Sequence, residues 1–172
     1  MKEQLEPVFV KSQQKLDYWN SQITPAELIT RRMNNERGQG WWFATGDPEF
    51  WRFSPTLLVN GGKALDVGMG FGRSTLFFAL NGMKITAYET SKPAIEAVKS
   101  LKETFDLPID IKEEDFSTAD LGENLYDTAF LAQTLVHSPS EEAAFEMIDR
   151  AIKALKPGGR LWLRASGIYD GS

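Results

Sequence analysis

The chain has 172 residues, of which 42% are hydrophobic and 25% are charged, a composition typical of one domain with a sizeable core. It contains no cysteine, which excludes a thiol nucleophile and a cysteine-ligated metal and favours a cytoplasmic location. The net charge of −5 provides no overall basic field for nucleic acid, and the apolar runs are too short for a membrane span or a signal peptide. We therefore expect neither a nucleic acid nor a membrane as partner.

The first part of the chain, residues 1–60, is predicted to form a helical cap rich in tryptophan. Four of the five tryptophans lie in this part. Helices are expected over residues 5–22 and 24–36. A third helix is expected to start at Pro48, because Asp47 is a favoured N-cap and proline is favoured at the first helical position.

From residue 61 onward, strand and helix patterns alternate with short connections. Strands are predicted over residues 63–68, 84–89, 108–115, 125–133 and 159–166, and helices over residues 72–82, 92–105 and 140–155. Such alternation predicts an α/β fold with a doubly wound, mostly parallel sheet and helices on both faces.

A glycine-rich loop, "LDVGMGFGRS", follows the first predicted strand. In a doubly wound sheet, ligands bind beyond the carboxyl ends of the strands, where the strand order reverses. Gly68, Gly70 and Gly72 would let the backbone turn sharply and approach a ligand, and the next helix would point its N-terminal amides at the same place. A tight turn without any ligand is the alternative interpretation.

Acidic residues lie at the ends of three consecutive predicted strands. Glu89, about 20 residues beyond the loop, could accept from both hydroxyls of a ribose. Asp115 could accept from an exocyclic amine, Phe116 could cover a purine face, and Asp66 would suit a ligand with an ammonium group. Together they favour a nucleoside site. The dinucleotide fingerprint fits less well, because the third glycine of the loop falls one place early.

Five segments together resemble the motifs of class I S-adenosylmethionine-dependent methyltransferases: "LDVGMGFG", "ITAYETS", "EEDF", "YDTAFLAQTLVH" and "ALKPGGRLWL". The resemblance covers roughly residues 60–167. It implies a sheet of order 3-2-1-4-5, with S-adenosylmethionine as cofactor and S-adenosylhomocysteine as product. The loop would hold the amino-acid end of the cofactor, with Gln133 beside its methionine part. The residues that the resemblance assigns to cofactor binding are Asp66, Gly68, Gly70, Gly72, Glu89, Thr90, Asp115, Phe116 and Gln133.

The resemblance also implies methyl transfer, and we expect the acceptor to be a small molecule. The covalent route to cytosine needs a cysteine, and the fourth strand lacks the signature of methylases that act on amino groups of nucleic acids. His137, the sole histidine, could act as general base, or it could be polar surface. Trp41 and Trp42 could wall the acceptor pocket, or they could pack onto the sheet. No cluster of residues has the spacing of metal ligands.

The sequence departs from the family at its carboxyl end, where the last two strands of the family sheet are apparently absent. We therefore expect residues 61–172 to be a C-terminally truncated domain that binds S-adenosylmethionine. The fifth strand would be an exposed edge, which predicts a homodimer through that edge or through the N-terminal helices. Two alternatives remain open: a binding module without transfer activity, and a lyase that consumes S-adenosylmethionine.

Overall fold

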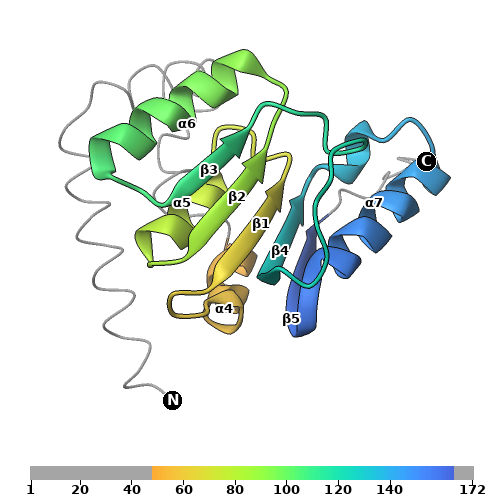
Figure 1. The fold of residues 1–172 in the computed structure, drawn as a ribbon, viewed down its shortest axis with the longest axis horizontal. Coiled ribbons are helices and arrows are strands. Elements are labelled where there is room, and N and C mark those ends of the chain that lie inside the picture. Colours follow the sequence, from red (N-terminus) through yellow and green to blue (C-terminus); the bar gives the residue numbers. More distant parts are fainter. Residues whose placement is uncertain (1–47, 165–172) are drawn as a thin grey trace.

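Residues 48–164 are the part of the chain that the computed structural model describes, and they form an α/β domain around a five-stranded sheet (Figure 1). The strand order is β3-β2-β1-β4-β5 and all neighbouring strands are parallel, which confirms the predicted fold class. The strands are β1 (Lys63–Val67), β2 (Lys84–Tyr88), β3 (Ile109–Lys112), β4 (Tyr126–Ala132) and β5 (Leu155–Arg164). The helices are α4 (Pro48–Leu57), α5 (Arg73–Leu80), α6 (Lys92–Phe105) and α7 (Glu141–Ala154), with a 3₁₀ turn η1 (Leu135–His137).

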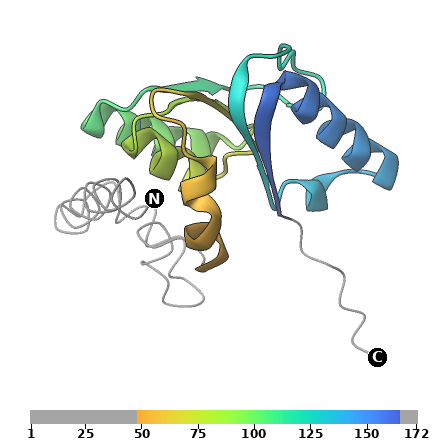
Figure 2. The same cartoon turned by 90° about the horizontal axis from the view of Figure 1, so that it is seen from below.

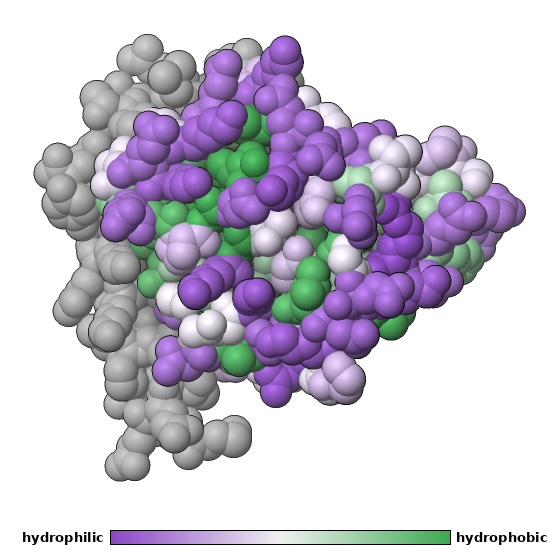
Figure 3. Space-filling model, viewed as in Figure 1, coloured by the Kyte–Doolittle hydropathy of each residue, from purple (hydrophilic) through white to green (hydrophobic). Residues whose placement is uncertain are grey.

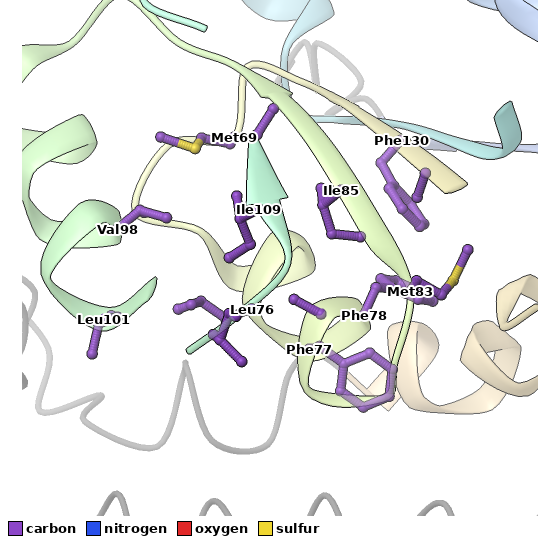
Figure 4. Close-up of a cluster of buried hydrophobic side chains, with 14 of the residues drawn as sticks. Met69, Leu76, Phe77, Phe78, Met83, Ile85, Val98, Leu101, Ile109 and Phe130 are labelled. Carbon is purple, nitrogen blue, oxygen red and sulfur yellow. The ribbon is translucent and has the colours of Figure 1, made fainter. Parts of the chain in front are cut away.

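Helices cover both faces of the sheet, with α4, α5 and α6 on one face and α7 on the other (Figures 1 and 2). On the first face, Phe78 of α5 stacks on Phe130 of β4 with ring centroids 4.3 Å apart. Figure 4 shows Met69, Ile85 and Phe130 among the side chains that fill this cluster. The second cluster joins side chains of β1 and β4 to α7. Burial of apolar surface on both faces therefore fixes which way each strand faces.

Most predicted boundaries agree with the structure, and the ends of two strands differ. The helix starts at Pro48 and after Ser140 are confirmed, since α7 is capped by the Ser140 hydroxyl, which accepts from the amide of Ala143 at 3.2 Å. The third strand ends at Lys112, three residues before the predicted Asp115, because a turn follows it. The fifth strand begins at Leu155, earlier than predicted, and its register against β4 shifts near this point.

A loop over residues 113–125 connects β3 to β4, and two side chains hold it against the sheet and α7. Arg150 of α7 donates to the carbonyl of Phe116 at 2.7 Å, and also to the carbonyls of Ser117 and Ala119. The Tyr88 hydroxyl donates to the carbonyl of Asp120 at 3.0 Å. The chain thereby crosses from the edge strand β3, past β2 and β1, to β4 without an intervening helix.

At the opposite edge of the sheet, Trp162 of β5 contacts Phe53 of α4, with ring centroids 5.5 Å apart. The predicted helices over residues 5–22 and 24–36 lie outside the described residues, as do Trp41 and Trp42. Within residues 48–164, no helix combines the length and the apolar character that a membrane span requires.

Candidate functional site

The loop after β1 is attached to the end of β2. The amides of Gly68 and Met69 both donate to the carbonyl of Tyr88 at 3.0 Å. Gly68, Gly70 and Gly72 have φ values of 73°, 53° and 84°, in the left-handed region that side chains disfavour. Three left-handed residues at alternate positions explain why the sequence has glycine at every second position here.

The three glycines nevertheless face different surroundings. A Cβ on Gly68 would lie 2.8 Å from the Thr134 methyl group, and one on Gly72 would lie 2.7 Å from the side chain of Val98. A Cβ on Gly70 would have nothing within 4 Å. Packing within the protein therefore accounts for the missing side chains at Gly68 and Gly72. Gly70 alone borders open space that a ligand could enter.

Glu89, which directly follows β2, lies against this loop. Its Oε2 accepts from the amide of Gly70 at 2.7 Å, and its Oε1 accepts from the amides of Thr90 and Ser91, both at 2.8 Å. A carboxylate offers about four acceptor positions, so one position on Oε2 remains for a ligand. The structure thus brings Glu89 and Thr90 to the glycine loop. Contact between Glu89 and two ribose hydroxyls stays a prediction.

Asp66, near the end of β1, is buried, with 2% of its surface exposed. Its Oδ2 accepts from the Thr75 hydroxyl at 2.6 Å. Burial raises the pKa of Asp66 to about 6, while the hydrogen bond from Thr75 and the charge of nearby Arg73 act in the opposite direction. Asp66 is therefore ionised at neutral pH and gains its proton in a mildly acidic solution.

The end of β4 meets the glycine loop at the point where the strand order reverses. Thr134 is buried, and its hydroxyl donates to the carbonyl of Val67 at 2.6 Å. Gln133, just before it, has a φ of 65°, which is uncommon for a residue with a side chain and is concentrated at functional sites. The amide of Gln133 donates to the carbonyl of Arg164 at 2.8 Å. Gln133 therefore lies at the end of β4, next in the chain to Thr134, and its position beside the methionine part of the cofactor stays a prediction.

The match to known families decides the classification. Residues 65–163 match the model of the family described as methyltransferase domain. The chain belongs to this family. The resemblance to S-adenosylmethionine-dependent methyltransferases is thereby confirmed, and with it the class of cofactor. The matched segment runs from β1 to β5 and contains the loop, Glu89 and Gln133.

Similar proteins differ in the reactions that their names state. The S-adenosyl-L-methionine-dependent Diels-Alderase iccD of Talaromyces variabilis is 32% identical over 143 residues, 81% of this chain and 43% of that protein. The sterol 24-C-methyltransferase ERG6B of Gibberella zeae is 32% identical over 123 residues, 66% of this chain and 30% of that protein. The chain thus spans less than half the length of both relatives.

A solved structure shows the same fold. The 1,6-didemethyltoxoflavin-N1-methyltransferase of Burkholderia thailandensis, with S-adenosylhomocysteine bound, aligns with a TM-score of 0.57 and 24% identity. The alignment covers 79% of this chain and 60% of that protein. TehB of Haemophilus influenzae aligns with a TM-score of 0.59 and 20% identity over 71% of this chain and 43% of that protein.

In the structure, Asp115 and Phe116 lie in the loop over residues 113–125. Their predicted position at the end of the third strand is therefore wrong. The Asp115 side chain is exposed and accepts from the amide of Ser117 at 2.8 Å. Hydrogen bonds from Ser117 hold the pKa of Asp115 below its ordinary value. Phe116 is half-buried against the hydrophobic cluster under α7. A role of these two residues in binding adenine stays a prediction.

His137 is the last residue of η1 and is exposed. The adjacent Ser138 hydroxyl is buried and has no hydrogen-bond partner within the described part of the chain. No group of three or more histidine, aspartate or glutamate residues among residues 48–164 could hold a metal ion. His137 therefore provides an accessible imidazole shortly after the end of β4.

The residues of the site fit a cofactor that carries an ammonium and a sulfonium. A Cβ on Gly70 would have nothing within 4 Å, Glu89 accepts from the amide of that glycine, and the buried Asp66 carboxylate lies two residues before the loop. The position of Thr134 at the loop and that of Arg73 near Asp66 were not predicted from the sequence. Only the sheet order brings Thr134 to the loop, so no local sequence signal could have identified it.

Proposed function

We propose that this chain transfers a methyl group from S-adenosylmethionine to a small-molecule acceptor. The observation that carries the proposal is the open space at Gly70, bordered by Glu89 and lying at the point where the strand order reverses between β1 and β4. The Glu89 carboxylate at the border of such a space suits a cationic nucleoside. The family assignment supports the same conclusion.

Residues of the loop and of the neighbouring strand ends would hold the cofactor. The Asp66 carboxylate would accept from its ammonium group, and Arg73 would attract its carboxylate. Glu89 would accept from the ribose through the acceptor position that the loop amides leave on Oε2. Gln133 would lie beside the methionine part, and the loop that contains Phe116 would reach the adenine.

The bound cofactor would supply an activated methyl group on a sulfonium. The protein then needs to hold the acceptor in line with that group, because proximity and orientation can provide most of the acceleration. His137 would take the proton of an acceptor that arrives protonated. Its exposure would allow the imidazole to release that proton to solvent.

A small molecule as acceptor is favoured by the names of similar proteins. They include methyltransferases for sterols and for didemethyltoxoflavin, and a ubiquinone biosynthesis O-methyltransferase of Coxiella burnetii that is 25% identical over 142 residues. Trp41 and Trp42 remain our candidates for the wall of the acceptor pocket.

A second candidate function is use of S-adenosylmethionine without methyl transfer. The specific observation in its favour is the 32% identity to a Diels-Alderase that depends on this cofactor. In such a reaction the protein would hold the cationic cofactor in place, and no S-adenosylhomocysteine would form.

Calorimetric titration with both nucleosides, followed by detection of S-adenosylhomocysteine in a panel of acceptors, tests these proposals. Gly70→Val should abolish binding, whereas Gly61→Val is the matched control, because Gly61 also has a positive φ and nothing within 4 Å. No heat from a folded protein with either nucleoside would refute the cofactor site. Binding without S-adenosylhomocysteine across the panel would support the second candidate, and loss of binding in both variants would show general damage.

A further inference from the structure

A pocket lies at the amino ends of the strands, at the opposite end of β1 from the glycine loop. The pocket has a volume of about 440 Å³ and opens between β1, β2, β3 and the start of β4. Its volume falls within the range of small-molecule sites. Lys63, Lys84 and Lys102 line it together with apolar side chains that include Leu107, Pro108 and Leu125.

Two of the lysines lie side by side. Lys63 and Lys84 are paired positions of the parallel strands β1 and β2, so their side chains leave the sheet on the same face. Like charges in neighbouring positions of a sheet destabilise it. Within residues 48–164, the ammonium groups of Lys63, Lys84 and Lys102 form no ion pair with a carboxylate. An anion between them would remove the repulsion.

Two carboxylates at the pocket or beside it, those of Asp110 and Asp127, are already engaged. Asp110, which lines it, forms an ion pair with Lys112 at 3.0 Å. Asp127 accepts from the ammonium of Lys156 and from the backbone amide of Lys63, both at 2.8 Å. The pocket is thus a positively charged region in a chain whose net charge is −5.

The pocket also offers apolar surface. Leu125 is 43% exposed, one of five large hydrophobic residues exposed to this degree within the described part of the chain. Pro108 is exposed beside it along the pocket wall. Figure 3 shows one face of the domain, on which hydrophobic and hydrophilic residues alternate; the residues of the pocket itself are those that line it, with Ile85 and Ile109 among the apolar ones. An apolar floor with cationic groups at its rim matches a ligand with an apolar body and an anionic head.

We propose that this pocket binds a small organic carboxylate with an alkyl or aromatic body. The ammonium groups of Lys63 and Lys84 would flank the carboxylate, with Lys102 at the rim, and Leu107 and Leu125 would contact the apolar body. The five residues of β1 separate the pocket from the glycine loop by roughly 15 Å. Binding at the pocket therefore requires no cofactor and is independent of the proposed methyl transfer.

An NMR titration of the 172-residue chain with octanoate tests the proposal. Amide signals of Lys84, Ile85 and Leu125 should shift, and those of Gly68 and Gly70 should not. Acetate has the charge without the apolar body, and octylammonium has the body with the opposite charge, so both should bind at least about tenfold more weakly. Equal affinity for octanoate and octylammonium, or shifts located elsewhere, would refute the site.

A pair of double variants supplies the matched control. Lys63→Gln with Lys84→Gln should weaken octanoate binding about tenfold, as expected for two partly exposed charges. Lys99→Gln with Lys153→Gln removes the same charge from exposed positions of α6 and α7 outside the pocket, and should change the affinity less than about twofold. Equal weakening in both would show attraction to net charge alone. Release of octanoate on self-association would show instead that a second copy of the chain occupies the pocket.

Discussion

Replacement of Asp66 by asparagine tests whether the chain retains a buried carboxylate for its cofactor at the expense of stability. Burial raises the pKa of Asp66 to about 6, from an ordinary value of 3.8. A difference of about two pKa units corresponds to about 3 kcal/mol between the protonated and ionised forms. Asparagine has nearly the same shape, carries no charge, and can still accept from the Thr75 hydroxyl with its amide oxygen.

The sign of the effect follows from the direction of the shift. The folded protein binds the Asp66 proton more tightly than the unfolded chain does. The stability that this proton contributes is complete below pH 3.8 and is lost as the pH rises through about 6. At pH 7.5, Asp66→Asn should therefore raise the free energy of unfolding by up to about 3 kcal/mol, and at pH 4 the gain should shrink to a small fraction of this value.

Urea unfolding between pH 4 and pH 8, followed by circular dichroism, measures this difference. Asp127→Asn is the control with the opposite sign. The hydrogen bond from Lys156 holds the pKa of Asp127 below its ordinary value, so this replacement should lower stability at pH 7 and matter less in acid. A difference between wild type and Asp66→Asn that stays flat from pH 4 to pH 7.5 would refute the reasoning about burial.

The same variant separates stability from function. Loss of a charge-assisted contact to the ammonium should weaken binding of S-adenosylmethionine about tenfold or more at pH 7.5. Wild-type affinity should fall by up to about tenfold per pH unit below pH 6, because Asp66 then becomes protonated. Unchanged affinity in a stabilised variant would show that Asp66 does not contact the cofactor.

Three further predictions concern the loop and its surroundings. Glu89→Gln should weaken cofactor binding about tenfold, as calorimetry would measure. It should also lower the free energy of unfolding by about 1–3 kcal/mol in urea, because the side-chain NH₂ of glutamine and the Gly70 amide are both donors and cannot form a hydrogen bond with each other. His137→Gln should lower kcat for acceptors that must lose a proton and leave cofactor affinity unchanged, as a pH profile of methyl transfer would show. Gly68→Ala should destabilise the protein less in a Thr134→Ala background than in wild type, in urea unfolding.

Regular alternation allowed most of the fold to be predicted from the sequence. The apolar spacing of α6 predicted both of its ends, and proline at the first helical position (Pro48) and the Ser140 cap predicted the starts of two helices. The third strand was predicted too long, because its acidic continuation has no periodicity that separates strand from turn. The strand ends at Lys112, and at Asp115 the chain is already in a turn. The Asp115 side chain accepts from the amide of Ser117, and the Asp115 carbonyl accepts from the amides of Thr118 and Ala119.

The contacts of the site between successive strands could be predicted from the sequence. Those that depend on the order of the strands in the sheet could not. Glu89 lies against the loop because β1 and β2 are neighbours, as expected for a strand and the next one along the chain. The φ of 65° at Gln133 could not be read from the sequence, since glutamine has no preference for that region. Likewise, no local signal pairs Thr134 with Val67, 67 residues away.

The contact between Gly68 and Thr134 can be tested by a double-mutant cycle. Alanine at position 68 would have two costs. The left-handed conformation costs about 1–2 kcal/mol. The contact of its Cβ with the Thr134 methyl group, at 2.8 Å, costs about 1–3 kcal/mol more. Thr134→Ala removes the methyl and hydroxyl groups and leaves only its Cβ, at 3.4 Å, so the second cost should vanish. Gly61→Ala has the same strain without the contact, so its cost should be equal in both backgrounds.

Additive effects of Gly68→Ala and Thr134→Ala would show that the two residues do not touch in the protein. A coupling of about 1–3 kcal/mol would show that the end of β4 holds the cofactor loop in place. Thr134→Ala alone also removes the hydrogen bond to the carbonyl of Val67, which frees the loop from β4. It should therefore weaken binding of S-adenosylmethionine even though Thr134 itself is buried, because a loop that must be ordered on binding reduces the affinity.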